Sequence, residues 1–196
     1  MGTAMVAHGL GEELHAKDPE DIYLAGLLHD IGILVNGILL LEDFRGVLEE
    51  AVKSKLPLEQ VEHLGFTHAE TGRILAELWR LPIELAEVLE HHSDALQQKT
   101  PSDATLLVHA ADLACLKLGL GYGYEPELGE AGELPRIWET LVPRFPTARA
   151  FNEESALRLL THLASAAEGL AEHKFTPVVT TGSHHAHEMH PVKPGR

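Results

Sequence analysis

The chain has 196 residues, enough for one domain with a continuous hydrophobic core. Acidic residues outnumber basic ones 30 to 15, and the net charge of −15 argues against binding to nucleic acids or anionic membrane surfaces. The single cysteine cannot form an internal disulfide, and no uninterrupted apolar stretch reaches the roughly 20 residues of a membrane-spanning helix. Together these features predict a soluble, cytoplasmic protein that binds neither nucleic acid nor membrane.

Apolar residues recur with helical spacing along most of the chain, and no segment alternates as a strand would, so the predicted fold class is all-α. A first helix is expected over residues 3–15. The next begins with Asp18 as its N-cap and Pro19 as its first residue, and it is expected to stop near Gly32.

The apolar run IGILVNGILLL, residues 31–41, is interrupted by Asn36 and Gly37. This pattern predicts a helix end, a turn and the buried start of a further helix over 38–54. A short helix is expected over 57–63, because Pro57 can open one.

Thr67 and Glu70 have the spacing of a capping box, which predicts a helix from this point to about Arg80. Three further helices are expected over 82–92, from 101–103 to 118 with Gly119 as C-cap, and over 137–141.

A loop rich in glycine and acid is expected over 119–135, and Asn152 can cap a long helix over 153–173. The last segment, 176–196, has no helical period and predicts a flexible tail. The tail contains His184, His185, His187 and His190, which could bind nickel, copper or zinc or could lie in a solvated, disordered end. The sequence therefore predicts a helical domain over 1–175 followed by a His-rich tail.

Six polar residues lie at the ends of apolar helices or inside them: His29, Asp30, His68, His91, His92 and Asp112. Val108, Cys115 and Leu116 are the helical neighbours of Asp112, so its carboxylate is expected in apolar surroundings. A buried carboxylate requires a partner. Imidazole and carboxylate together suit manganese, iron or zinc, whereas calcium prefers oxygen ligands alone.

Each of these features also has a simpler interpretation. The pair His29 and Asp30 could be a capped or salt-bridged polar spot, and His91 and His92 could be a solvated helix end. Adjacent helical residues diverge by about 100°, so the two residues of a pair cannot point along one line, although both can flank a metal at the helix edge. We interpret the recurrence of six such groups as one shared site. Five other histidines are interpreted as ordinary surface or packing residues: His8, His15, His63, His109 and His162.

Four segments carry a family resemblance: AGLLHDIG, LGFTHAETGRILAELWRLP, VLEHH and HAADLACLKLGLGYG. Their order and spacing over roughly 4–172 resemble the HD superfamily of metal-dependent phosphohydrolases, and above all its HDOD branch, the HD-related output domains. The resemblance implies an HD-like helical bundle in which His29 and Asp30 are the eponymous pair and Asp112 closes one metal site. It makes Asp30 the residue on which catalysis would depend.

The resemblance further implies that His68, His91 and His92 hold a second divalent ion, as in two-metal members that hydrolyse phosphoesters. The sequence departs from the family in two places. The histidine usual on the first helix would fall before Met1, which implies a first helix truncated at its N-terminus. Ile33 stands where the many enzymes that read HDIGK have lysine.

Two functions follow from the resemblance. One is a metal-dependent phosphohydrolase that acts on a nucleotide or another phosphorylated small molecule in bacterial signalling. The other is a catalytically inactive HDOD output module that regulates a signalling protein partner, with the metal site structural or vestigial.

Overall fold

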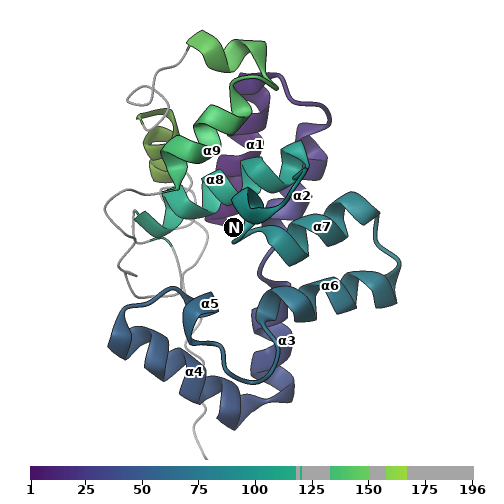
Figure 1. Ribbon diagram of the computed structural model, residues 1–196, viewed down its shortest axis with the longest axis vertical. Helices are drawn as coiled ribbons and strands as arrows, with labels where there is room; N and C mark the ends of the chain where they lie inside the picture. The colour runs from purple at the N-terminus through teal and green to yellow at the C-terminus, as the bar shows by residue number, and fades with distance from the viewer. Residues whose placement is uncertain (118–119, 121–132, 151–157, 167–196) are drawn as a thin grey trace, which may run out of the picture.

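The computed structural model describes residues 1–117, 120, 133–150 and 158–166. Every regular element in these ranges is a helix, which confirms the predicted all-α bundle (Figure 1). The helices are α1 (Gly2–Leu14), α2 (Pro19–Leu28), α3 (Ile31–Leu39), α4 (Leu41–Ser54), α5 (Leu58–Val61), α6 (His68–Trp79), α7 (Ile83–His91), η1 (Ala95–Gln97), α8 (Asp103–Lys117), α9 (Leu134–Leu141) and η2 (Pro146–Ala150).

The main hydrophobic core is built around α8, in which every residue from 105 to 112 is buried. Helix α1 packs on α2 and α8, while α7 and α9 contact other parts of α8. Their apolar side chains form one cluster in the upper part of the molecule (Figure 1). Because α8 is covered on most sides, its polar residues lie among apolar neighbours.

A second, smaller hydrophobic cluster joins α4 and α5 in the lower part of the molecule (Figure 1). Its buried residues are Phe44, Val47, Ala51, Leu58 and Val61. Helix α3 packs against both α4 and α6, so it connects this cluster to the rest of the bundle.

Two glycines allow helices to approach at backbone distance. A Cβ atom on Gly26 would lie 2.8 Å from Cα of Ala4, and one on Gly32 would lie 1.9 Å from the carbonyl oxygen of His68. The first glycine lets α2 meet α1 and the second lets α3 meet the start of α6. Both approaches flank the pair His29 and Asp30.

The predicted helix from Pro19 to Gly32 and the predicted turn at Asn36 and Gly37 are both wrong. The chain breaks earlier, with α2 ending at Leu28 and α3 starting at Ile31. Helix α3 continues through Asn36, whose buried Oδ1 accepts a hydrogen bond of 2.9 Å from Thr71 Oγ1. A partner on α6 thus satisfies the Oδ1 atom of the residue that had suggested a turn, whereas the buried Nδ2 atom has no hydrogen-bond partner.

The next helix consequently starts at Leu41 instead of residue 38, and its first residue is exposed, not buried. The capping box is confirmed, since Thr67 Oγ1 accepts from the Glu70 N–H at 3.1 Å and Glu70 Oε2 accepts from the Thr67 N–H at 2.7 Å. Helix α9 begins at Leu134, inside the segment predicted as loop. The predicted cap at Gly119, the start of the helix predicted over 153–173 and the tail 176–196 lie outside the described residues.

One stretch, Pro19–Leu39, is long and apolar enough to cross a membrane by length and composition, which the sequence analysis did not expect. Buried core helices pass the same test. This stretch comprises α2 and α3, which break at His29 and Asp30 and pack against α1, α6 and α8. A third of the apolar window, 33%, is buried inside the bundle, and one such helix among the described residues is weak evidence for a membrane span.

The close helix approaches make a stability prediction. Gly32→Ala should lower the free energy of unfolding by about 1–3 kcal/mol or more, because the new methyl group must displace backbone instead of a flexible side chain. Gly46→Ala is the matched control, since nothing lies within 4 Å of its Cβ position and alanine favours a helix interior by about 0.5–1 kcal/mol. Urea unfolding followed by circular dichroism measures both. Equal midpoints for Gly32→Ala and the unchanged chain would contradict the close approach.

The cysteine gives a second prediction. Burial, together with the nearby Asp112 carboxylate, raises the pKa of the Cys115 thiol to about 11. Since the thiolate is the reactive form, Cys115 should resist Ellman's reagent at pH 8 in the folded protein and react fully in denaturant. Comparable reaction rates in the two conditions would show that the thiol is accessible.

Candidate metal centre

Five of the six polar residues selected from the sequence converge at one place. They form two groups, His29, Asp30 and Asp112 in one and Asp30, His68 and His92 in the other, and within each group the potential ligand atoms lie within 4.8 Å of one another. The groups share Asp30. Their residues come from the break between α2 and α3, the start of α6, the end of α7 and the middle of α8.

The first group is centred on the His29 imidazole. Its Nε2 atom lies 3.0 Å from Asp30 Oδ2 and 3.3 Å from Asp112 Oδ1. Thr3 of α1 donates a hydrogen bond of 3.2 Å to the same Asp112 oxygen. The break after Leu28 lets the consecutive residues His29 and Asp30 face one point, whereas adjacent residues of a regular helix diverge by about 100°.

The second group brings two imidazoles to the other oxygen of Asp30. Oδ1 lies 3.5 Å from His68 Nε2 and 3.4 Å from His92 Nε2, and the two nitrogens are 3.2 Å apart. Both histidine side chains are fully buried, whereas the Asp30 side chain is 25% exposed. Asp30 therefore lies where the centre opens to solvent.

The remaining ring nitrogens of the three histidines have oxygen partners. His29 Nδ1 donates to Gly26 O at 2.8 Å, His68 Nδ1 to Glu62 Oε2 at 2.9 Å and His92 Nδ1 to Leu89 O at 3.2 Å. Since carbonyl and carboxylate oxygens accept, Nδ1 carries the hydrogen, and in the neutral ring Nε2 presents a lone pair. Three Nε2 atoms thus point at the oxygens of Asp30, and either a proton on the ring or a cation can lie between nitrogen and oxygen.

The pKa values of these groups also indicate that the centre needs positive charge. Burial alone would lower the pKa of His29, but the carboxylates of Asp30 and Asp112 outweigh it and raise that pKa well above its usual value. Burial alone would raise the pKa of Asp30, but His29 and His92 hold it well below its usual range. The Asp30 carboxylate therefore stays ionised, and either protons on the imidazoles or a metal ion must balance its charge.

The distances fit a metal ion in each group. Ligand atoms about 2.0–2.2 Å from one ion are at most about 4.4 Å apart. The nitrogen–oxygen separations of 3.0–3.5 Å quoted above fall within this limit. The imidazole and carboxylate donors suit manganese, iron or zinc, as the sequence predicted. The two groups could therefore hold divalent ions.

His91 is the one predicted site residue that the structure does not bring to the centre. Its Nδ1 atom lies 3.0 Å from Asp94 Oδ1 and its Nε2 atom 3.8 Å from Glu90 Oε2. Adjacent helical residues point about 100° apart, and His92 is the one of the pair that faces inward. His91 thus belongs to neither group.

Sequence reasoning missed three residues around the centre. Buried His109 donates from Nδ1 to the carbonyl oxygen of His92 and pairs through Nε2 with Glu133 Oε2 at 3.0 Å, so it supports the ligand helix α7. Its position one helical turn before Asp112 could have revealed this. Glu59 and Glu62 of the α5 segment lie beside His68. Their spacing of three residues, out of step with apolar Leu58 and Val61, was the available signal.

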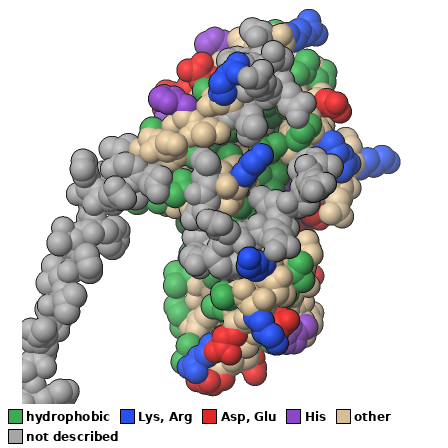
Figure 2. Space-filling model, turned by 90° about the vertical axis from the view of Figure 1, so that its left-hand side faces the viewer, with side chains coloured by type: hydrophobic (Ala, Val, Ile, Leu, Met, Phe, Trp, Pro, Cys, Tyr) green, Lys and Arg blue, Asp and Glu red, His purple; other side chains and the backbone are tan. Residues whose placement is uncertain are grey.

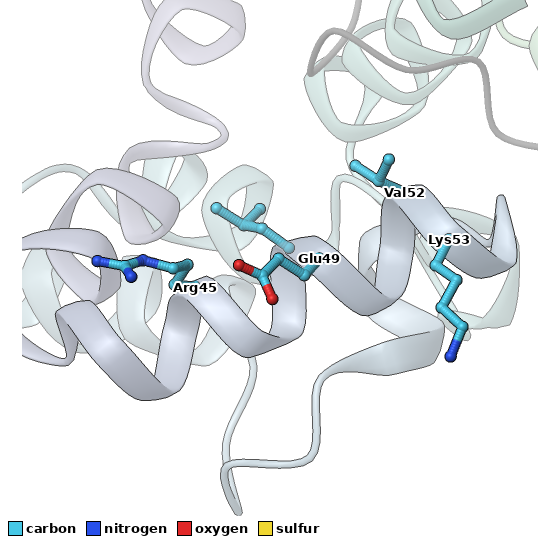
Figure 3. Close-up of a pocket in the computed structure, with 5 residues that line it drawn as sticks. Arg45, Glu49, Val52 and Lys53 are labelled. Carbon is cyan, nitrogen blue, oxygen red and sulfur yellow. The ribbon is translucent and has the colours of Figure 1, made fainter.

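A shallow hollow on the surface is separate from this centre. It is lined by Arg45, Leu48, Glu49, Val52 and Lys53, all on α4 (Figure 3). In the view of Figure 2, charged side chains of both signs gather at the lower end of the molecule, where Figure 1 places α4. The hollow contains none of the converging histidines and aspartates.

Comparison with protein families gives one match, an HDOD domain over residues 1–95. The matched segment contains four of the five converging residues and ends before Asp112. No curated protein and no solved structure matches the chain. The match confirms the resemblance found in the sequence: residues 1–95, slightly less than half of the chain, are similar to an HDOD domain.

Proposed function

We propose that this protein is a cytoplasmic, metal-dependent phosphohydrolase of the HD superfamily that acts on a nucleotide or another phosphorylated small molecule in bacterial signalling. The observation that carries the proposal is the convergence of three imidazole Nε2 atoms on the two oxygens of one carboxylate, Asp30. Such a set of buried donors is costly to assemble unless a cation occupies it.

The five converging residues would have different roles as metal ligands. Asp30 bridges the two groups, His29 and Asp112 complete one, and His68 and His92 complete the other. Bound divalent ions would supply an activated water and neutralise charge on the phosphate oxygens. The partly exposed Asp30 marks the side from which a substrate reaches the centre.

The charge of the chain sets a condition on this function. The net charge of −15 repels anionic substrates, and Ile33 offers no cation next to the HD pair. Attraction of a phosphate group must therefore come from the ions themselves, which reverse the local sign of the field.

A second candidate function is regulation of a signalling protein partner without catalysis. Large apolar side chains are exposed around the turn between α6 and α7: Leu78 is 73% exposed, Trp79 59% and Ile83 78%. Exposed apolar groups gathered on one part of a surface are typical of protein interaction sites. In this alternative the metal centre would stabilise the domain.

Metal content tests the proposed centre directly. Protein purified without added metal should contain manganese, iron or zinc, and Asp30→Asn should lose it from both groups because the carboxylate is shared. His91→Ala is the matched control, since His91 lies in the same motif but outside both groups and should leave the metal content unchanged. Elemental analysis by mass spectrometry measures all three proteins. Equal metal content in Asp30→Asn and His91→Ala would refute the centre.

Activity separates the two candidate functions. With Mn²⁺ added, the protein should hydrolyse members of a panel of nucleotides and phosphorylated small molecules, and Asp30→Asn should lower the rate at least about 100-fold. The surface variant Trp79→Ser should keep the full rate. Metal binding without turnover of any compound in the panel would favour the regulatory function.

A further inference from the structure

The short helix α5 presents two different faces. Leu58 and Val61 are buried against α4 in the smaller hydrophobic cluster. Glu59 and Glu62, each one position further along, share the other side of the helix turn and both lie within 4 Å of His68. The smaller cluster thus fixes two carboxylates beside the second metal group.

Glu62 holds His68 at two points. Its Oε1 atom accepts from the backbone N–H of His68 at 2.8 Å, and its Oε2 atom accepts from Nδ1 at 2.9 Å. The Glu62 side chain is only 1% exposed, so these bonds form away from competing water. They set both the start of α6 and the orientation of the imidazole, which leaves Nε2 facing Asp30.

Glu59 approaches the same imidazole from the metal side. Its Oε1 atom lies 3.8 Å from His68 Nε2, but the ligand atoms that all lie within 4.8 Å of one another belong to Asp30, His68 and His92 and do not include Glu59. The Glu59 side chain is 28% exposed, as Asp30 is 25% exposed, whereas His68 is fully buried. Glu59 therefore lies at the open edge of a group whose other sides are closed by protein.

We propose that Glu62 is the positioning residue that aims His68 at the ion held by Asp30, His68 and His92. The inference rests on the proposed metal centre. It assigns a role outside the HD motif to the α5 segment.

The test uses the full chain and Mn²⁺ alone, with free Mn²⁺ counted by electron paramagnetic resonance. Glu62→Gln should weaken one bound ion by about 10–100-fold and leave the other unchanged. Glu50→Gln is the control, because it removes the same charge from an exposed position on α4. A general loss of folding would weaken both ions, so selective loss is the readout of positioning.

The affected ion is identified with Asp112→Asn, which should weaken the ion of the first group. Combining Asp112→Asn with Glu62→Gln should then weaken both ions. Wild-type affinity for every ion in Glu62→Gln would overturn the inference while leaving the proposed function intact. No Mn²⁺ bound by the unchanged chain would instead refute the proposed centre.

Discussion

The architecture depends on one carboxylate, Asp30, which is approached by three imidazole nitrogens from three separate parts of the chain. Removing charged groups from water costs several kcal/mol unless opposite charge accompanies them. Two local features of the bundle bring these groups together. The break between α2 and α3 aims His29 and Asp30 at one point, and the absence of a side chain at Gly32 lets α3 approach His68.

The fold could be predicted from the sequence where helical period and capping signals agree, as at Thr67 and Glu70. It could not be predicted where a tertiary contact replaces a local signal. Asn36 and Gly37 resemble a turn because their polarity and flexibility stand out, yet Asn36 is a buried helical residue whose Oδ1 accepts a hydrogen bond from Thr71 while its Nδ2 has no partner. The break between α2 and α3 could not be predicted either, because the local sequence around His29 gives no helix stop signal.

The candidate site could be predicted to a larger extent, because buried ionisable groups are costly and therefore conspicuous in an apolar sequence. His91 shows the limit of this reasoning: two adjacent histidines look equivalent in sequence, and only the rotation of α7 decides that His92 faces inward. Glu59 and Glu62 were not predicted as site residues, because charged side chains on a short helix usually face solvent. Only the packing of Leu58 and Val61 against α4 turns these acids toward the centre.

The smaller hydrophobic cluster has a consequence for how the molecule comes apart. Five buried residues stabilise α4 and α5, far fewer than surround α8, and regions with few buried contacts open before the whole domain unfolds. Since Glu62 ties this region to the His68 ring, each transient opening releases one wall of the centre while the main core stays intact. An ion bound at the proposed centre would then exchange with solvent when α4 and α5 open locally. The rate of that exchange would depend on the local stability of this region.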